Sequence, residues 1–209
     1  MTQLDSKILV TAQKYLSKAD PVMKQLIKRS GPFALRSDPV RSPFEALTRA
    51  IASQQLHGAA AEAILGRFIA LVPGKAFPEP DDIEQLTDDQ IRSTGFSRSK
   101  ILALRDLAEK VTHGIVPSSE EINTMDDDAI VSRIIQVRGI GRWTIEMLLI
   151  FKLGRMDVLP VDDFGVRKGF MRAYGCVEMP KPKEILAHGE KWRPYRTVAS
   201  WYLWRAACE

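Results

Sequence analysis

The sequence has few cysteines and few histidines. Its 209 residues include two cysteines, Cys176 and Cys208, and three histidines, at positions 57, 113 and 188. Two thiols are too few for a disulfide scaffold or for the four thiolates that usually hold an iron–sulfur cluster. The histidines are scattered and lack the spacing of metal ligands. We therefore expect free thiols, no cofactor and no catalytic metal.

Long apolar stretches are also absent. No run approaches the roughly twenty apolar residues that a transmembrane helix needs. The N-terminal residues MTQLDSKILVTAQKYL include an early aspartate and lack the uninterrupted apolar core of a signal peptide. We expect an intracellular protein, in the cytoplasm and nucleoid or in a nucleus, with no membrane partner.

The charged residues are distributed unevenly along the chain. The net charge of +4 is only mildly basic and does not by itself indicate a nucleic-acid partner. Residues 133–172, however, contain eight basic and four acidic side chains, whereas residues 79–89 contain six acids and residues 120–128 five, both without a base. Such a concentration of positive charge favours a surface that faces phosphates, and a solvated face without a ligand is the plainer alternative.

Nearly every segment has the apolar spacing of an amphipathic helix rather than the alternation of a strand, which predicts an all-α fold. Ser42-Pro43 and Arg193-Pro194 place proline at a first helical position. Helices are expected over residues 5–17, 20–29, 43–55, 59–71, 88–93, 98–112, 127–137, 142–153, 163–173, 182–190 and 194–206.

A proline-rich loop over residues 73–80 is the expected boundary between two helical lobes. One lobe would take approximately residues 35–120. The other would take residues 121–209 together with the N-terminal helices. A cleft between the lobes is expected.

Two glycines separate two helical patterns in VRGIGRWTIEMLLIF, residues 137–151. Glycines permit the dihedral angles of a tight turn and leave amides accessible at the start of the second helix. A phosphate oxygen would meet those amides, the positive end of a helix dipole, and Arg138 and Arg142. Such a contact is indifferent to base order. Alone, Gly-x-Gly is more often a simple helix cap.

The motif GIGRWT, followed by PVDD at residues 160–163, resembles the helix-hairpin-helix DNA glycosylases of the AlkA type, DNA-3-methyladenine glycosylase II. Residues 42–61, 94–108 and 192–204 are similar to further segments of that family. The resemblance implies a two-lobed helical enzyme of base excision repair. It would flip an alkylated purine, such as 3-methyladenine or 7-methylguanine, out of duplex DNA and hydrolyse its N-glycosidic bond, acting as a monomer.

The resemblance assigns the catalytic carboxylate to Asp163, and Asp162 is the competing register. An Asp-Asp pair before a helix is also an ordinary N-cap. A carboxylate about 4 Å from the developing positive charge of the sugar gains about 4 kcal/mol at an effective dielectric near 20. That energy corresponds to about a thousandfold in rate, before the cost of desolvation.

The resemblance also assigns a pocket for the flipped base to Trp143, Phe164 and Trp204. Electron-rich rings favour cationic purines by stacking and cation–π attraction. Where the family has a tyrosine, this chain has Met147, which makes the pocket less aromatic. Relatives that cut the DNA strand carry a lysine where this chain has Trp143, so we expect hydrolysis without lyase activity. Trp192 and Trp201 are expected in the core.

Contacts with DNA are expected from two segments. The hairpin would bind the backbone through Arg138, Gly139, Ile140, Gly141 and Arg142, and its carbonyls are candidates for holding a cation. In SQQLHG the resemblance places the side chain that fills the gap left by the flipped base. Gln55 leads, Leu56 is the alternative, and His57 would reach the minor groove.

Two other functions remain open from the sequence. One is a related glycosylase that acts on other damaged or mismatched bases. The other is a non-catalytic DNA-binding protein that uses the hairpin as a phosphate clamp. The PVDD element argues against a pure clamp, because a carboxylate beside an anionic backbone gains nothing.

Overall fold

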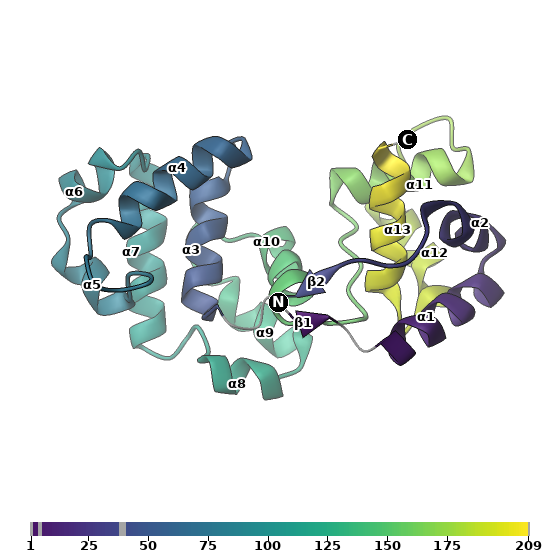
Figure 1. Ribbon diagram of the computed structural model, residues 1–209, viewed down its shortest axis with the longest axis horizontal. Coiled ribbons are helices and arrows are strands. Elements are labelled where there is room, and N and C mark those ends of the chain that lie inside the picture. The colour runs from purple at the N-terminus through teal and green to yellow at the C-terminus, as the bar shows by residue number, and fades with distance from the viewer. Residues whose placement is uncertain (1, 4–5, 38–40, 209) are drawn as a thin grey trace. The chain divides into compact units, whose positions relative to one another are not determined.

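The computed structural model describes residues 2–3, 6–37 and 41–208, and this part of the chain is almost entirely helical (Figure 1). The all-α fold predicted from the apolar periodicity is confirmed. The exception within the described residues is one short antiparallel pair, β1 (Thr2–Gln3) with β2 (Arg36–Ser37). No described helix is long and apolar enough to cross a membrane.

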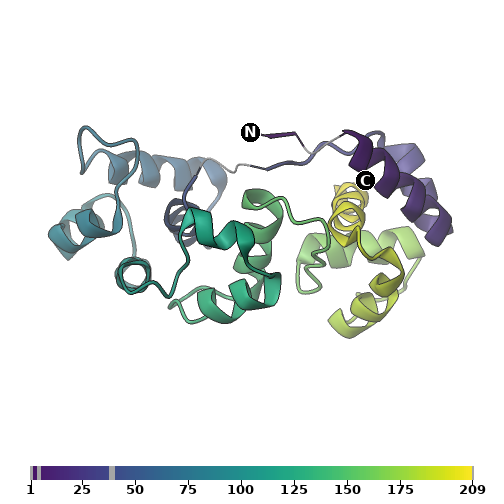
Figure 2. The ribbon, with the colours of Figure 1, turned by 90° about the horizontal axis from the view of Figure 1, so that it is seen from below.

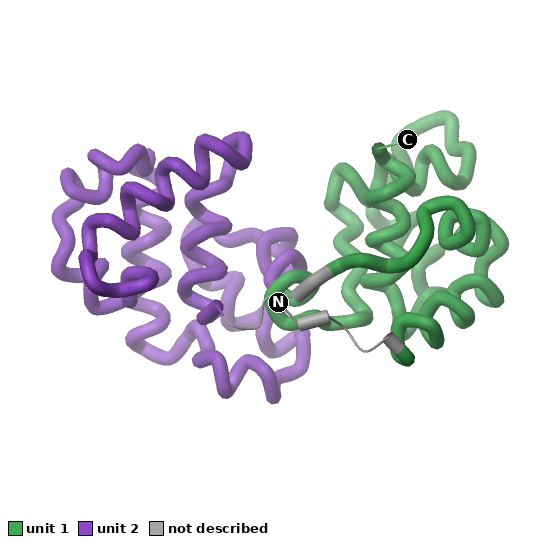
Figure 3. Tube along the Cα trace, viewed as in Figure 1, with its two compact units in different colours: residues 1–39, 149–209 green, residues 40–148 purple. Residues whose placement is uncertain are grey.

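The chain divides into two compact units, which Figure 3 draws in different colours. Unit 1 comprises residues 1–39 and 149–209, and unit 2 comprises residues 40–148. The sequence placed the boundary at residues 73–80 and residues 121–148 in the other lobe, but in the structure both segments lie within unit 2. Residues 121–148 are tied there because the Arg133 side chain donates to the carbonyl of Ile115, and the Arg138 amide donates to the carboxylate of Asp106.

Unit 2 is built around a long central helix, α7 (Arg98–Thr112), whose Leu104 and Leu107 are fully buried. Serine hydroxyls cap the N-termini of several helices. The Ser42 side chain accepts a hydrogen bond from the Glu45 amide, and the Ser97 side chain accepts one from the Lys100 amide. The helices of unit 2 are α3 (Pro43–Ser53), α4 (Gly58–Ile69), α5 (Pro80–Gln85), α6 (Asp88–Ser93), α7 (Arg98–Thr112), α8 (Ser119–Thr124), α9 (Asp127–Ile134) and α10 (Arg142–Met147).

Unit 1 has α13 (Arg196–Cys208) at its centre, with buried residues on all sides of the helix. Beside it lies α11 (Phe164–Tyr174), as Figures 1 and 2 show. The two helices can approach closely because Gly169 has no side chain. A Cβ built on it would lie 1.8 Å from the carbonyl oxygen of Leu203. The remaining elements are α1 (Ser6–Ala19), α2 (Pro21–Ser30), α12 (Pro182–Gly189), the 3-10 turn η2 (Glu190–Trp192) and the π-helical segment η1 (Leu148–Lys152), whose first residue belongs to unit 2.

Three local predictions differ from the structure. Helices α5 and α8, of six residues each, were not among the expected helices. The helix expected over 142–153 ends at Met147 and continues as η1. Pro194 is not a first helical residue: the Tyr195 amide donates to the carbonyl of Trp192 in a turn, and α13 begins at Arg196.

Candidate functional site

Asp163 is the N-cap of α11. Its Oδ1 accepts the backbone amide of Val166 at 2.8 Å, and its own amide donates to the carbonyl of Pro160 at 3.0 Å. The PVDD segment is therefore a tight turn that ends in a capped helix. Asp163 is partly buried at the positive end of α11, whereas Asp162 lies exposed in the turn. Of the two registers that the sequence left open, Asp163 has the fixed carboxylate.

Trp204 contacts this carboxylate directly. Its indole Nε1 donates to Oδ1 of Asp163 at 2.7 Å, from one helix of unit 1 to the start of another. The ring of Phe151 stacks on the indole with centroids 5.8 Å apart and an interplanar angle of 22°. The structure thus brings together two residues that the sequence assigned to the site, Asp163 and Trp204. Within unit 1, the Nε1 edge of the Trp204 indole is therefore hydrogen-bonded to Asp163, and one face of the indole is covered by Phe151.

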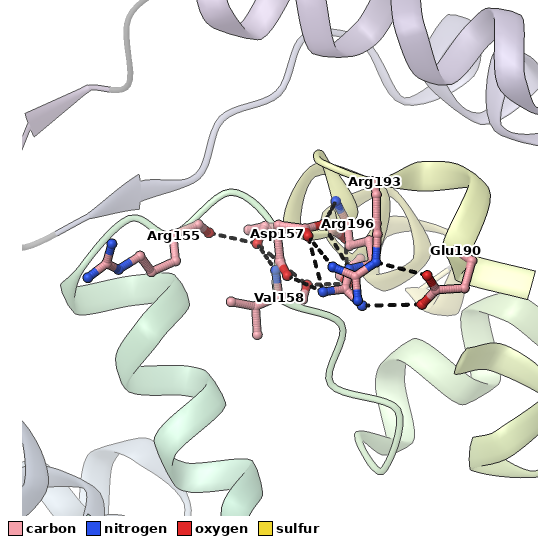
Figure 4. Close-up of polar contacts among 8 residues, drawn as sticks. Arg155, Asp157, Val158, Glu190, Arg193 and Arg196 are labelled. Carbon is pink, nitrogen blue, oxygen red and sulfur yellow. Dashed lines mark hydrogen bonds and ion pairs between the residues drawn. The ribbon is translucent and has the colours of Figure 1, made fainter. Parts of the chain in front are cut away.

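The segment that leads into Asp163 is anchored to the start of α13. Both carboxylate oxygens of Asp157 receive arginine side chains: Arg193 Nη1 lies 2.7 Å from Oδ2, and Arg196 Nε lies 2.7 Å from Oδ1 (Figure 4). The Thr197 hydroxyl donates to the carbonyl of Arg155 at 2.7 Å. These bonds anchor the segment between η1 and the PVDD turn to the start of α13, and this segment leads directly to Asp163.

The sequence did not single out two residues that precede Asp163 in the chain, Phe151 and Asp157. Phe151 follows the apolar run LLI and resembles a core residue, but it is 43% exposed while Ile150 is fully buried. The π-helical geometry of η1 changes the helical period at this point. Asp157 was counted only as one acid in a basic segment. Its position after a helix and before PVDD gave no signal of the arginines 36 and 39 residues away.

The hairpin turn uses its two glycines differently. Gly139 has a φ of +74°, which disfavours any side chain, whereas Gly141 has extended backbone and is the N-cap of α10. A Cβ built on Gly141 would meet nothing within 4 Å. Ile140 between them is buried, and its amide donates to the carbonyl of Val137 at 3.1 Å. The buried isoleucine thus fixes the turn, and the second glycine leaves open space at the start of α10.

Two residues outside the motif hold the hairpin in place. Oδ2 of Asp106 accepts the Arg138 amide at 2.6 Å, and Gln54 Nε2 donates to the carbonyl of Gly139 at 2.8 Å. Burial raises the pKa of Asp106, but the Arg138 amide and the Lys110 ammonium lower it more, so the pKa of this carboxyl falls below its usual range. The sequence pattern singled out neither anchor.

The turn between α3 and α4 carries the proposed gap-filling residues. Gln55 is exposed with a φ of +59°, and it is the one described non-glycine residue in the left-handed region. Leu56 is 40% exposed, and His57 is exposed at the N-cap position of α4 without a side-chain cap bond. Gln54, which binds the hairpin, immediately precedes Gln55. The structure therefore places this turn beside the hairpin within unit 2.

The other predicted pocket residues are distributed over both units. Trp143 and Met147 lie on α10 in unit 2, where Trp143 is 47% exposed and Met147 is partly buried. Phe164 lies in unit 1 directly after Asp163 and is 67% exposed. Trp192 is fully buried, as expected for the core, whereas Trp201 is half-buried against Phe33.

The basic segment over residues 133–172 is less available than its composition predicts. Arg133 pairs with Glu121, Arg167 donates to the carbonyl of Pro180, and Arg172 donates to the carbonyl of Ala207. Lys152 is buried. Arg138 is exposed, and Arg142 keeps 63% of its side chain exposed while its Nε lies 3.1 Å from Glu146. The exposed charge at the hairpin therefore comes from the two arginines that flank the Gly-Ile-Gly turn.

Among the described residues, no group of three or more histidine, cysteine or acidic side chains has the arrangement of a metal site. At the hairpin, the carbonyl of Gly139 already accepts the side-chain amide of Gln54.

Residues 48–194 match the family described as HhH-GPD superfamily base excision DNA repair protein. DNA-3-methyladenine glycosylase 1 of Schizosaccharomyces pombe is 40% identical over 95% of this chain and 88% of its own length. A solved 3-methyladenine DNA glycosylase of the same yeast, in complex with abasic DNA, superposes with a TM-score of 0.83 over 93% of this chain and 95% of its own. A DNA-3-methyladenine glycosidase of Bacillus halodurans, 36% identical, superposes with a TM-score of 0.85 over 94% of this chain and 88% of its own.

The chain belongs to the HhH-GPD superfamily of base excision DNA repair proteins. The family resemblance inferred from GIGRWT and PVDD is confirmed.

Proposed function

We propose that this chain is a monofunctional DNA glycosylase that removes alkylated purines, such as 3-methyladenine and 7-methylguanine, in base excision repair. The observation that carries the proposal is the carboxylate of Asp163, held at the start of α11 by the Val166 amide and the Trp204 indole. The relatives named as 3-methyladenine glycosylases support it, because they are similar over almost the whole chain. The protein would act as an intracellular monomer on duplex DNA.

Binding to the DNA backbone is the first step of the proposed reaction. The open N-terminus of α10 at Gly141 and the exposed Arg138 and Arg142 would meet phosphate oxygens. Gln55 is exposed, has left-handed backbone and follows Gln54, which binds the hairpin, so Gln55 or Leu56 would fill the gap left by the flipped nucleotide. His57, exposed in the same turn, would contact the minor groove.

Cleavage follows once the base has left the helical stack. Each unit offers an exposed aromatic ring for stacking on a purine: Phe164, directly after Asp163, in unit 1, and Trp143, on α10 with Met147, in unit 2. Asp163 stabilises positive charge at C1′ while water adds there and the N-glycosidic bond breaks. The bonding electron pair stays with the purine, so an alkylated cation leaves as a neutral base, and the proton lost by water passes to solvent.

The chemistry of the hairpin favours hydrolysis alone. A lyase needs an amine to form a Schiff base with the sugar, and the residue after Gly-Ile-Gly-Arg is Trp143. Preference for cationic purines follows from the exposed aromatic rings, which attract electron-poor bases by stacking and cation–π interaction. The proposed products are the free base and an intact strand with an abasic site.

A base-release assay tests the proposal. Duplex DNA treated with a methylating agent is incubated with the protein in EDTA, and released bases are separated by chromatography. We expect 3-methyladenine and 7-methylguanine from the wild type and about a thousandfold slower release from Asp163→Asn. Equal release from both proteins would remove Asp163 from catalysis. DNA binding without any release would favour the non-catalytic alternative, and strand cleavage without alkali would contradict hydrolysis alone.

A further inference from the structure

The carboxylate of Asp163 receives two hydrogen bonds on the same oxygen. Val166 N lies 2.8 Å from Oδ1 and Trp204 Nε1 lies 2.7 Å from it. The first is an ordinary cap bond within α11. The second comes from α13, and it is a charge-assisted bond from a rigid planar donor. Together the two donors hold Oδ1 from two helices, α11 and α13, which a cap bond alone does not do.

The indole reaches Asp163 because α11 has a face without side chains. Gly165 and Gly169 are four residues apart, so they lie on the same side of the helix, and both meet α13. A Cβ on Gly169 would lie 1.8 Å from the Leu203 carbonyl oxygen, and one on Gly165 would lie 2.8 Å from Trp204 Cδ1. The same atom on Gly165 would lie 3.1 Å from Oδ1 of Asp163. Gly165 therefore provides the space in which the hydrogen bond forms.

The indole is held on its other sides as well. Phe151 covers one face in a near-parallel stack, at 5.8 Å between centroids. Trp204 is consequently fixed by a ring on its face, a glycine beside Cδ1 and a carboxylate at Nε1. A tryptophan whose task was only to stack on a base would not need its N–H bound to the catalytic acid.

We propose that Trp204 is a positioning residue for Asp163, and that Gly165 is the specific small residue that permits this contact. The proposal rests on the proposed role of Asp163 and assigns Trp204 to the chemical step rather than to binding of the base. Loss of a hydrogen bond to a charged group corresponds to about a tenfold to hundredfold fall in rate.

An NMR experiment tests the contact without reference to activity. The four tryptophans of the chain give four indole N–H resonances, and Trp204→Phe identifies the one from Trp204. Asp163→Ala removes the acceptor, whereas Asp163→Asn would keep one. We expect Asp163→Ala to move the Trp204 indole resonance upfield and to leave the Trp192 resonance in place. An unmoved Trp204 resonance would overturn the proposal.

A kinetic cycle tests the role. Single-turnover release of 7-methylguanine is measured for the wild type, Trp204→Phe, Asp163→Ala and the double variant, together with the affinity for abasic-site DNA. We expect Trp204→Phe to slow release about tenfold to a hundredfold with little change in affinity, and to have no further effect once Asp163 is alanine. An equal loss in both backgrounds would assign Trp204 to stacking and overturn the proposal.

The two assignments fail separately in this cycle. Asp163→Ala with wild-type rate would refute the proposed function, whatever Trp204 does. If Asp163→Ala releases base no faster than spontaneous depurination, the double variant carries no kinetic information. The movement of the Trp204 indole resonance in Asp163→Ala then decides whether Trp204 positions Asp163. Unfolding curves for each variant show that the protein is folded under the assay conditions.

Gly165→Ala provides a second route with a matched control. An added methyl at Gly165 displaces the indole from Asp163, so we expect a fall in rate close to that of Trp204→Phe. Gly66→Ala changes an exposed glycine inside α4, where an added Cβ meets nothing within 4 Å, and we expect it to keep the wild-type rate. Wild-type rate in Gly165→Ala, with the Trp204 resonance unmoved, would overturn the assignment of Gly165.

Discussion

Asp20 and Asp163 lie in the same unit, and each caps a helix of similar length and accepts a hydrogen bond from a tryptophan indole. Asp20 caps α2 through Val22 N, and Trp192 Nε1 lies 3.0 Å from its Oδ2. Asp163 caps α11 through Val166 N, with Trp204 as the indole donor. The same local chemistry therefore occurs twice, and what differs is the surrounding structure.

The surroundings of Asp20 are closed. Its side chain is 1% exposed, and Oδ2 also contacts Tyr174 at 2.6 Å, His188 at 3.1 Å and Lys191 at 3.1 Å. Burial alone would raise the pKa of Asp20, but the bonds from His188, Tyr174, Trp192 and Lys191 lower it well below its usual range. This carboxylate joins four elements of unit 1 and has no access to a substrate.

Asp163 differs because it is only partly buried and because it opens a helix that begins with exposed Phe164. An aspartate that caps a helix and accepts an indole hydrogen bond is thus a structural link when its carboxylate is buried. It is a candidate catalytic group when part of the carboxylate is exposed to solvent. The comparison predicts that neutralising the two acids has opposite consequences for activity and stability.

The largest expected effect is on the rate of base release by Asp163→Asn. We expect a loss of about a thousandfold, because the charge facing the sugar is removed while the side-chain oxygen that caps α11 remains. Asp20→Asn, assayed at a temperature at which it is folded, should keep a rate near that of the wild type. Single-turnover release of 7-methylguanine measures both. A comparable loss of rate in the two variants would remove the distinction.

The free energy of unfolding should show the opposite order, with a larger loss for Asp20→Asn than for Asp163→Asn. Asp20→Asn presents amide hydrogens to the donors that now share one carboxylate, and it removes the charge that faces Lys191. Removing one member of a buried charged network costs about 3 kcal/mol or more. We expect urea unfolding to show a loss of this size for Asp20→Asn and a loss of under about 1 kcal/mol for Asp163→Asn. Similar unfolding midpoints for the two variants would contradict the structural role of Asp20.

Acid should weaken the wild type more than Asp20→Asn. The pKa of Asp20 is lower in the folded protein than its ordinary value of 3.8, so at low pH the unfolded chain binds the proton more tightly. The stabilisation by Asp20 is therefore fully present well above pH 4 and is lost as the pH falls below that value. We expect the difference in unfolding free energy between the two proteins to shrink between about pH 5 and pH 3. A constant difference across that range would argue against this linkage.

The sequence was sufficient to predict the family and the helical fold, and it singled out PVDD, whose role in catalysis stays a prediction. Those features depend on local patterns, such as the apolar period of each helix and the Gly-Ile-Gly turn. It also predicted that Trp192 is a core residue. What it could not provide is the partner of each acid, because Trp204 lies 41 residues from Asp163 and Trp192 lies 172 residues from Asp20.

Two other features that the sequence did not reveal have the same origin. Phe151 resembles a core residue until η1 changes the helical period and exposes it. The composition of the basic segment favours a phosphate-binding surface. In the structure, however, Glu121 pairs with one of its arginines and backbone carbonyls accept hydrogen bonds from two others. In each case the decisive contact is set by the packing of elements that are distant in the chain, and a single sequence does not contain that information.

A smaller effect than that of Asp20→Asn is expected from Tyr174→Phe, which removes one donor to Asp20 and keeps the ring that stacks on Phe170 at 4.2 Å. We expect a loss of about 1.5 kcal/mol at neutral pH, typical of a hydrogen bond to a charged group. Burial and the bond to Asp20 raise the pKa of Tyr174, so the unfolded chain releases its proton first as the pH rises above 10. The wild type should therefore lose its advantage over Tyr174→Phe between about pH 9 and pH 11, as measured by urea unfolding. An advantage that persists undiminished at pH 11 would show that the pKa of Tyr174 is not raised in the folded protein, and it would argue against the bond to Asp20.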